Sequence, residues 1–147
     1  MDDLIRTDDQ LNRCLFFASA KLARVIGRTA EDKFKRTGLS PSHEFLLYIV
    51  NTNDGIHQKK IGEMLHMTPS TITRFVQSLE SKELLSSKSD GKNAYIYSTE
   101  KGMLLQADII KAWESMHGIF EEILTPEEKD HFILTVNKLI GKLEEKR

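Results

Sequence analysis

Apolar residues in the first third of the chain recur every three or four positions, the period of an amphipathic α-helix. From about Asp8 to Lys35 this pattern contains no proline and predicts one long helix that ends at Gly38. Ser40-Pro41 then predicts the start of a second helix, because serine is a favourable N-cap and proline fits the first helical position. Residues 45–50 are uniformly apolar, so we expect this second helix in the core.

Two short helical patterns follow, joined by only three residues, His66-Met67-Thr68. The first covers residues 58–65. The second repeats the cap-and-proline signal at Thr68-Pro69 and continues to about residue 82. Its apolar positions form one stripe, made of Ile72, Phe75, Val76 and Leu79. Two short helices with so tight a connection predict a helix-turn-helix, whose second helix enters the major groove of DNA.

Residues 84–88 and 94–98 have strand-forming composition around the turn-rich segment 89–93, which predicts a β-hairpin. Ile56 is expected to add a short third strand. A helix-turn-helix followed by a hairpin is a winged helix. The predicted fold class is therefore mostly α with a small β wing (α+β), with about six helices and a two- to three-stranded antiparallel sheet.

The last third of the chain predicts two more helices. Thr99 caps the first, whose apolar residues extend to Ile123, and Thr125-Pro126-Glu127-Glu128 is a capping box that opens the second. Together with the N-terminal helix they exceed what a winged helix needs for its core. Their surplus apolar faces predict a homodimer formed through the N- and C-terminal helices.

The polar face of the helix over residues 68–82 is unusual, because it carries short hydrogen-bonding side chains around one guanidinium group instead of a Glu/Lys mixture. The simpler interpretation is a solvated helix surface that is rich in serine and threonine. The helix-turn-helix spacing and the wing favour the other interpretation, a surface that reads DNA. Its candidate residues are Thr68, Ser70, Thr71, Thr73, Arg74 and Gln77.

Charge supports this interpretation only through its distribution. The chain of 147 residues has a net charge of −1, which by itself argues against a partner rich in phosphate. Residues 57–102 are nevertheless the only third in which basic residues outnumber acidic ones, by seven to five. No apolar run approaches the roughly 20 residues of a membrane helix. We therefore expect a cytoplasmic protein without a membrane partner.

Several short segments together resemble the MarR family of bacterial transcription regulators. They are Thr71-Ile72-Thr73-Arg74-Phe75-Val76, Leu79-Glu80, Asp90-Gly91-Lys92 and Thr99-Glu100-Lys101-Gly102. Three positions depart from the family pattern: Lys92 replaces an arginine of the wing, Ser98 replaces a leucine, and Glu83 replaces the glycine that usually closes the recognition helix. The wing also looks a few residues short.

The resemblance implies a single domain over residues 1–147. Within it, residues 39–102 would form the DNA-binding lobe, with the recognition helix at about 68–82 and the wing at about 84–98. Residues 1–38 and 103–147 would form the dimerisation helices. The implied function is that of a sequence-specific regulator, most often a repressor, that binds a palindromic operator in double-stranded DNA. A small effector, often aromatic or anionic in the family, would control it.

By family position, Thr71, Thr73 and Arg74 would contact bases or lie near them, and Arg74 is the best candidate for a bidentate contact with guanine. Ser70 and Gln77 would contact phosphate or a flanking base.

Four lysines extend the candidate surface. Lys88 and Lys92 either keep the hairpin soluble or lie near the minor groove and its phosphates, and the resemblance favours the second role for Lys92. Lys59 and Lys60, at the start of the first short helix, are candidates for phosphate contacts or ordinary surface lysines.

Alternatives to a ligand-responsive regulator remain. Cys14 suggests a redox-sensing regulator of the same family, although a small apolar side chain packed at the dimer interface is the favoured interpretation. A winged-helix module that binds protein instead of DNA is a further alternative. The five histidines are scattered singly, and no catalytic or metal-binding motif occurs. We therefore expect no enzyme, no metal and no cofactor.

Overall fold

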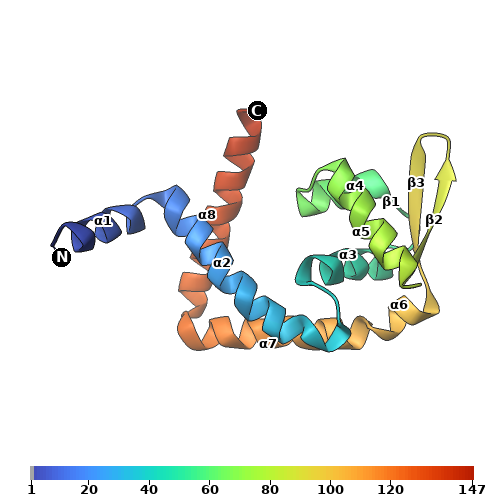
Figure 1. The fold of residues 1–147 in the computed structure, drawn as a ribbon, viewed down its shortest axis with the longest axis horizontal. Helices are drawn as coiled ribbons and strands as arrows, with labels where there is room; N and C mark the ends of the chain where they lie inside the picture. Colours follow the sequence, from blue (N-terminus) through green and yellow to red (C-terminus); the bar gives the residue numbers. More distant parts are fainter. Residues whose placement is uncertain (1) are drawn as a thin grey trace.

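A computed structural model describes the backbone of residues 2–147 and the side chains of residue 3 and residues 6–147. Met1, with which the predicted domain begins, lies outside them. This part of the chain forms eight α-helices, one short 3-10 helix (η1) and three strands (Figure 1). In order they are α1 (Asp2–Asn12), α2 (Leu15–Phe34), η1 (Lys35–Thr37), α3 (Pro41–Thr52), β1 (Ile56–His57), α4 (Gln58–Leu65), α5 (Pro69–Ser81), β2 (Leu85–Asp90), β3 (Asn93–Ser98), α6 (Glu100–Leu104), α7 (Gln106–Ile123) and α8 (Pro126–Glu145).

Helices α3 to α6 and the sheet form a lobe around one apolar core. Leu46 and Leu47 of α3, Ile61 of α4 and Ile72 of α5 are buried together with Ile96 of β3. Each such side chain contributes about 1.5–3 kcal/mol when it leaves water. The strands are antiparallel in the order β1-β3-β2. The third strand expected at Ile56 is therefore present, and the predicted winged-helix fold class is confirmed.

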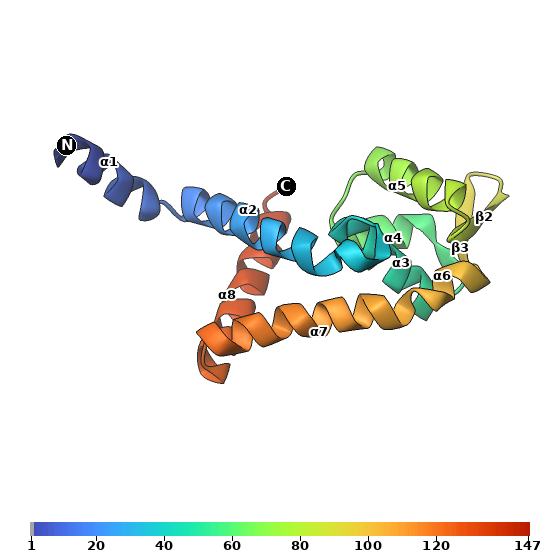
Figure 2. The same cartoon turned by 60° about the horizontal axis from the view of Figure 1, so that its bottom comes forward.

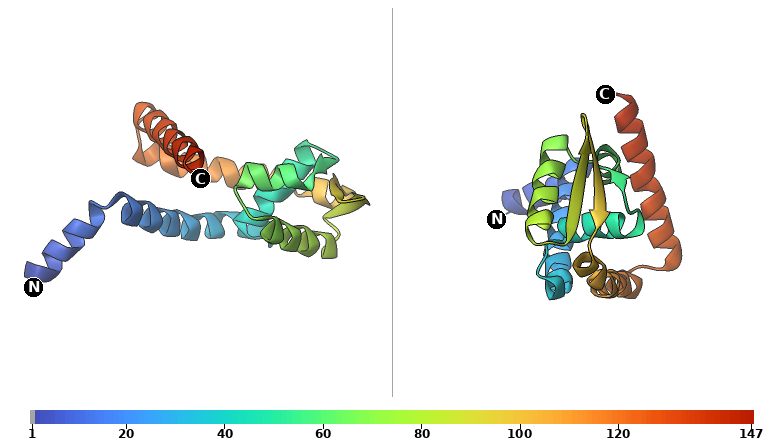
Figure 3. Two further views of the ribbon diagram at one scale, coloured as in Figure 1. Left: turned by 90° about the horizontal axis from the view of Figure 1, so that it is seen from above. Right: turned by 90° about the vertical axis from the view of Figure 1, so that its right-hand side faces the viewer.

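The long helices form a second layer beside the lobe. α2 and α7 lie side by side, and α8 turns back from the end of α7 (Figures 1 and 3). Between α2 and α7 a smaller core buries Phe34, Ala112 and Met116. At Thr125 both hydrogen bonds of the predicted capping box are present, so the start of α8 follows the sequence signal.

The long N-terminal helix predicted over residues 8–35 is wrong in one respect, because it is broken at Arg13 and Cys14. The N–H groups of these two residues bond to carbonyls three residues back, and Cys14 has an extended backbone (φ −79°, ψ 119°). Every described side chain of α1 is exposed, and α1 projects away from the other helices (Figure 2). Among the described residues, no buried side chain of α1 therefore holds it in line with α2. The predicted end at Gly38 is confirmed, with φ 75°.

The helix predicted from Thr99 to Ile123 is likewise broken, at Leu105, between α6 and α7. A Cβ on Gly102 would collide with the backbone oxygen of Leu84, so only glycine allows α6 to approach the sheet this closely. The Gly102 carbonyl accepts hydrogen bonds from the Asn51 amide (3.1 Å) and from the N–H of Leu105 (3.2 Å). This three-residue spacing tightens the turn and redirects the chain into α7. The two breaks explain why eight helices form where about six were expected.

Candidate DNA-binding surface

The predicted recognition helix is α5, and its apolar stripe faces the core. Ile72, Val76 and Leu79 are buried, and Phe75 is half-buried against them. The opposite face is open to solvent. Of the predicted contact residues on α5, Ser70, Thr73, Arg74 and Gln77 are exposed and Thr71 is half-buried.

Thr68 fixes the first turn of α5. Its hydroxyl oxygen accepts a hydrogen bond from the N–H of Thr71 at 3.4 Å. It also lies 3.0 Å from Thr71 Oγ1 and 3.3 Å from Ser70 Oγ. The three hydroxyl groups therefore cluster at the N-terminal end of the helix, where backbone N–H groups and the helix dipole favour an anion such as phosphate.

Arg74 lies in the middle of the exposed face. Within residues 2–147 as described, its guanidinium forms neither an ion pair nor a hydrogen bond. Its five N–H donors therefore remain available in their fixed planar arrangement, which matches guanine or phosphate in a bidentate contact.

Thr73 is held by two hydrogen bonds, one of which comes from outside α5. Its hydroxyl group donates to the Pro69 carbonyl at 3.0 Å. The side-chain amide of Gln58, the first residue of α4, donates to Thr73 Oγ1 at 3.1 Å. Sequence periodicity did not identify Gln58, because the hydrogen bond joins two helices and leaves no periodic signal.

Both helices of the helix-turn-helix end in the same way, with a non-glycine residue in the left-handed conformation. His66 (φ 52°) follows α4, and Glu83 (φ 60°) follows α5. After α5, the N–H of Leu84 bonds to the carbonyl of Leu79 (3.0 Å), and the N–H of Glu83 bonds to that of Glu80 (2.9 Å). These are the two bonds of a Schellman motif, in which glycine is the usual left-handed residue. Glu83 therefore occupies a glycine position, as the sequence pattern indicated.

The wing is a hairpin with a tighter turn than predicted. The segment 89–93 was expected to be a loop, but Asp90 pairs with Asn93, which leaves only Gly91 and Lys92 in the turn. Gly91 has φ 64°, the sign that a first turn residue of type II′ requires. The strands β2 and β3 therefore extend further than the composition suggested, and Lys92 lies at the tip.

Hydrogen bonds connect the wing to both helices of the helix-turn-helix. The Glu80 carboxylate of α5 accepts from the backbone N–H (3.2 Å) and the hydroxyl group (3.1 Å) of Ser87 in β2. His57 caps α4 by accepting from the N–H of Lys59 at 3.1 Å, and its other ring nitrogen lies 2.9 Å from the Asn93 side-chain oxygen in β3. The recognition helix and the wing are therefore positioned together.

The structure places the four candidate lysines in three environments. Lys92 is exposed at the tip of the wing, whereas Lys88 lies on β2 with its ammonium 4.9 Å from the centre of the Tyr97 ring. Lys59 and Lys60 are exposed at the start of α4, and Lys60 pairs with Glu63 at 3.8 Å. All four belong to the same lobe as α5 (Figure 1).

Behind this surface, at the joint between the lobe and the long helices, lies a buried carboxyl group. Glu44 of α3 is fully buried, and burial raises its pKa to about 7, although the hydrogen bond from Thr37 opposes the shift. The negative charge of Asp108 on α7, which pairs with Arg36 at 3.5 Å, raises the pKa of Glu44 further. Burial also lowers the pKa of His43, with a smaller contribution from Lys82, and the His43 ring packs on Phe75 of α5.

Cys14 is exposed and directly precedes α2. The joint between α1 and α2 lies far from α5 and the wing (Figure 1). The two basic neighbours of Cys14 in sequence have other partners, since Arg13 pairs with Asp9 and Lys21 bonds to the Asn12 side chain. The redox role of Cys14 stays a prediction.

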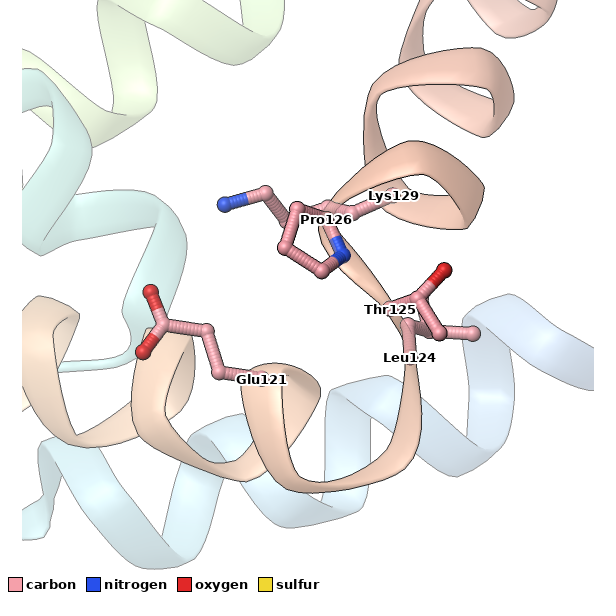
Figure 4. Close-up of a pocket in the computed structure, with 5 residues that line it drawn as sticks. All are labelled: Glu121, Leu124, Thr125, Pro126 and Lys129. Carbon is pink, nitrogen blue, oxygen red and sulfur yellow. The ribbon is translucent and has the colours of Figure 1, made fainter.

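Other features of the described residues do not form a second site. Figure 4 shows a hollow at the turn between α7 and α8, where Glu121 and Lys129 point into the same space beside Thr125 and Pro126. These last two residues open α8, so the hollow is the corner that the helix start creates. Within the described chain no group of three acidic, histidine or cysteine side chains is arranged to hold a metal ion. Likewise, none of the described helices is long and apolar enough to cross a membrane.

Comparison with known proteins finds a family model that matches part of this chain. The model of the MarR family matches residues 39–94, which contain α3 to α5, β2 and the start of β3. Comparison with curated protein sequences gives no match.

Solved structures of similar fold cover most of this chain. MepR of Staphylococcus aureus in complex with DNA has 19% identity and a TM-score of 0.80, and the match covers 88% of this chain and 98% of that one. A putative MarR family regulator from Listeria monocytogenes, complexed with a 26mer DNA, has 23% identity and a TM-score of 0.78, with 91% of each chain covered. CouR from Rhodococcus jostii RHA1, bound to p-coumaroyl-CoA, has 21% identity and a TM-score of 0.72, again with 91% of each chain covered. The chain therefore has the winged-helix fold of these structures, and its residues 39–94 match the model of the MarR family.

Proposed function

We propose that this protein binds a palindromic operator in double-stranded DNA as a homodimer and regulates transcription from it as a ligand-responsive repressor. The observation that carries the proposal is the exposed polar face of α5, with an unpaired Arg74 at its centre among the described residues and Lys92 on the adjoining wing. In helix-turn-helix proteins the second helix enters the major groove, which supports this role for α5. The two solved structures of similar fold with DNA support this use.

The homodimer is proposed because α8 lacks a partner within the chain. None of its residues is buried, yet it carries large apolar side chains. Those that lie on one stripe are Phe132, Val136, Leu139, Ile140 and Leu143. An exposed apolar stripe of this length indicates an interaction surface, and a second copy of the chain presents an identical stripe that can pack against it. Two recognition helices would then address half-sites about one DNA turn apart.

The effector is proposed to be a small aromatic or anionic compound. Trp113 of α7 is packed edge-to-face against Phe45 and Tyr48 of α3, at centroid distances of 6.0 and 5.1 Å, and stacked on His117. This cluster lies between a long helix and the lobe. A compound that binds there could favour one orientation of the lobe relative to α7. In a dimer, that change of orientation would alter the spacing of the two recognition helices. A coupling of about 1–3 kcal/mol would change DNA affinity 5- to 150-fold.

Selection of bound DNA from a random duplex pool tests the proposal. We expect the purified protein to enrich an inverted repeat, with affinity that falls steeply as salt rises, since phosphate contacts release counterions. A protein that binds no duplex even at low salt would instead favour a module that recognises protein. Once an operator is known, titration of aromatic carboxylates against the fluorescence of Trp113, the one tryptophan in the chain, tests the effector site.

A further inference from the structure

We infer that Gln58 is a specificity-determining residue of DNA recognition, acting by holding the Thr73 hydroxyl group as a hydrogen-bond acceptor toward the bases. This inference rests on the proposed function. Its basis is the hydrogen bond from the Gln58 amide to Thr73 Oγ1, which links the first residue of α4 to the exposed face of α5. The sequence pattern had assigned Gln58 no role in recognition.

The hydrogen-bond capacity of Thr73 decides what it can present to DNA. A threonine hydroxyl group has one proton to donate and two lone pairs that accept. The proton is used in the bond to the Pro69 carbonyl at 3.0 Å. One lone pair is used by the Gln58 amide at 3.1 Å. What remains on the exposed side is one acceptor position and the methyl group.

This remaining pattern matches some bases better than others. In the major groove, cytosine and adenine offer amino groups that donate, and thymine offers a methyl group for apolar contact. Guanine offers only acceptors there. A hydroxyl group that accepts a hydrogen bond donates more strongly, so the Gln58 amide strengthens the bond from Thr73 to the Pro69 carbonyl. Without Gln58, only that weakened bond would hold the proton, and a guanine acceptor could compete for it. The contact from α4 therefore restricts Thr73 to bases other than guanine.

The donors and acceptors of Thr73 also determine the orientation of the Gln58 amide. If its oxygen and nitrogen were exchanged, the oxygen would face Thr73 Oγ1 and require the hydroxyl proton. That proton already bonds to the Pro69 carbonyl within α5. Only the amide nitrogen satisfies both contacts at once, so Gln58 donates.

A double-mutant cycle on the selected operator tests the inference. Gln58→Met keeps the length of the side chain but cannot donate, and Thr73→Val keeps the shape of threonine without the hydroxyl group. Each variant is titrated against the operator and against duplexes changed at one base pair at a time. We expect each single variant to lose about fivefold discrimination against guanine at one and the same base pair, as for one hydrogen bond of about 1 kcal/mol. The double variant should lose no more than either single one.

Lys59→Met is the matched control, since it alters the next residue of the same helix and removes a charge. It should weaken binding to all duplexes alike. Melting curves of Gln58→Met, unchanged from the wild type, would separate the specificity role from a general loss of folding. Losses that multiply in the double variant, or unchanged base preference in Gln58→Met, would overturn the inference. Wild-type binding to the operator is measured in the same experiment, so failure of the proposed function would be seen separately.

Discussion

Arg74 is the residue that we propose as the central base contact of α5. It is exposed, and no described residue competes for its five N–H donors. We predict that Arg74→Ala lowers discrimination between the operator and scrambled DNA by about 1–3 kcal/mol, the value of a bidentate contact with guanine. Competition titrations with both duplexes measure this directly.

Arg74→Lys is the control that separates base recognition from charge. Lysine keeps the positive charge but lacks the planar arrangement of donors. We expect the lysine variant to bind scrambled DNA like the wild type and still to lose operator preference. If Arg74→Ala retained full discrimination, Arg74 would not be the central base contact.

The backbone conformation of Glu83 leads to a prediction about stability, because this residue adopts φ 60° in a position that favours glycine. A side chain with a Cβ costs about 1–2 kcal/mol in the left-handed region. We predict that Glu83→Gly increases the free energy of unfolding by about 1 kcal/mol, after part of this gain is offset by the greater freedom of glycine in the unfolded chain. Urea denaturation at fixed protein concentration measures it.

The adjoining Lys82 provides the control for Glu83. Its backbone has φ −89°, so glycine brings no relief there. Lys82→Gly should lower stability by about 0.5–1 kcal/mol. If both glycine variants changed stability in the same direction, the left-handed conformation of Glu83 would not be the cause.

At the scale of elements, local signals predicted most of the DNA-binding lobe. The cap-and-proline pairs at Ser40-Pro41 and Thr68-Pro69 located the starts of α3 and α5, and the three-residue link identified the helix-turn-helix. These signals are short-range, so the sequence contains them in full. The breaks at Cys14 and Leu105 were missed because they depend on what each helix packs against.

The difference between short-range sequence signals and contacts between elements also applies to the candidate surface. Helical periodicity was sufficient to place Ser70, Thr73, Arg74 and Gln77 on the exposed face of α5. Gln58 could not be found in this way. Its side chain crosses from one helix to another, and the pattern within either helix contains no record of that contact.

The wing and the start of α4 lead to a prediction about salt. Lys92 at the hairpin tip and Lys60 at the start of α4 flank the recognition helix, and both are exposed. If each contacts a phosphate, Lys60→Ala and Lys92→Ala should each reduce the slope of log K against log salt by about 1. Lys111→Ala on α7 is the control and should leave the slope unchanged. Unaltered slopes in both test variants would remove the phosphate assignment.

At the scale of the whole molecule, the exposed apolar stripe of α8 leads to a prediction about assembly. Leu139 lies on this stripe and is 40% exposed, whereas Leu134 lies on the opposite side of α8 and is 69% exposed. Leu139→Glu should shift the protein to a monomer and abolish binding to the inverted repeat, because a charge would be buried between the two copies. Sedimentation velocity measures the assembly.

Leu134→Glu introduces the same charge into the same helix on the other face. It should leave both assembly and operator binding unchanged. A wild-type protein that sediments as a stable monomer would contradict the proposed dimer, whatever the variants do.

At the joint between the long helices and the lobe, one oxygen of the buried Glu44 carboxyl group has no hydrogen-bond partner among the described residues. Thr37 Oγ1 lies within hydrogen-bond distance of the Phe34 carbonyl (3.3 Å), the N–H of Leu39 (3.2 Å) and the Glu44 carboxyl group. The hydrogen bond that Thr37 donates to Glu44 Oε1 favours the charged carboxylate, whereas Glu44 Oε2 is buried with no hydrogen-bond partner among the described residues. Burial of the carboxyl group outweighs the bond from Thr37, so the joint favours the neutral acid and the pKa of Glu44 is raised.

The resulting pH dependence has a defined sign. The pKa of Glu44 is about 7 in the folded protein, against an ordinary value of 4.5. The folded state therefore binds the proton more tightly, so its contribution to stability is complete below about pH 4.5 and is lost as pH rises through about 7. We predict that this loss amounts to about 1–3 kcal/mol between pH 5 and pH 8. Urea denaturation across this range measures it, at fixed protein concentration because assembly also affects stability.

Glu44→Gln should remove this part of the pH dependence, since the glutamine amide oxygen can accept the hydrogen bond from Thr37 and the amide does not titrate. The variant should be more stable than the wild type at pH 8 and similar to it at pH 5. Glu31→Gln, an exposed change on α2, should leave the wild-type profile unchanged. If Glu44→Gln lost stability with rising pH as steeply as the wild type, a different group would be responsible. The joint between the lobe and the long helices would then not be the part of the molecule that responds to pH.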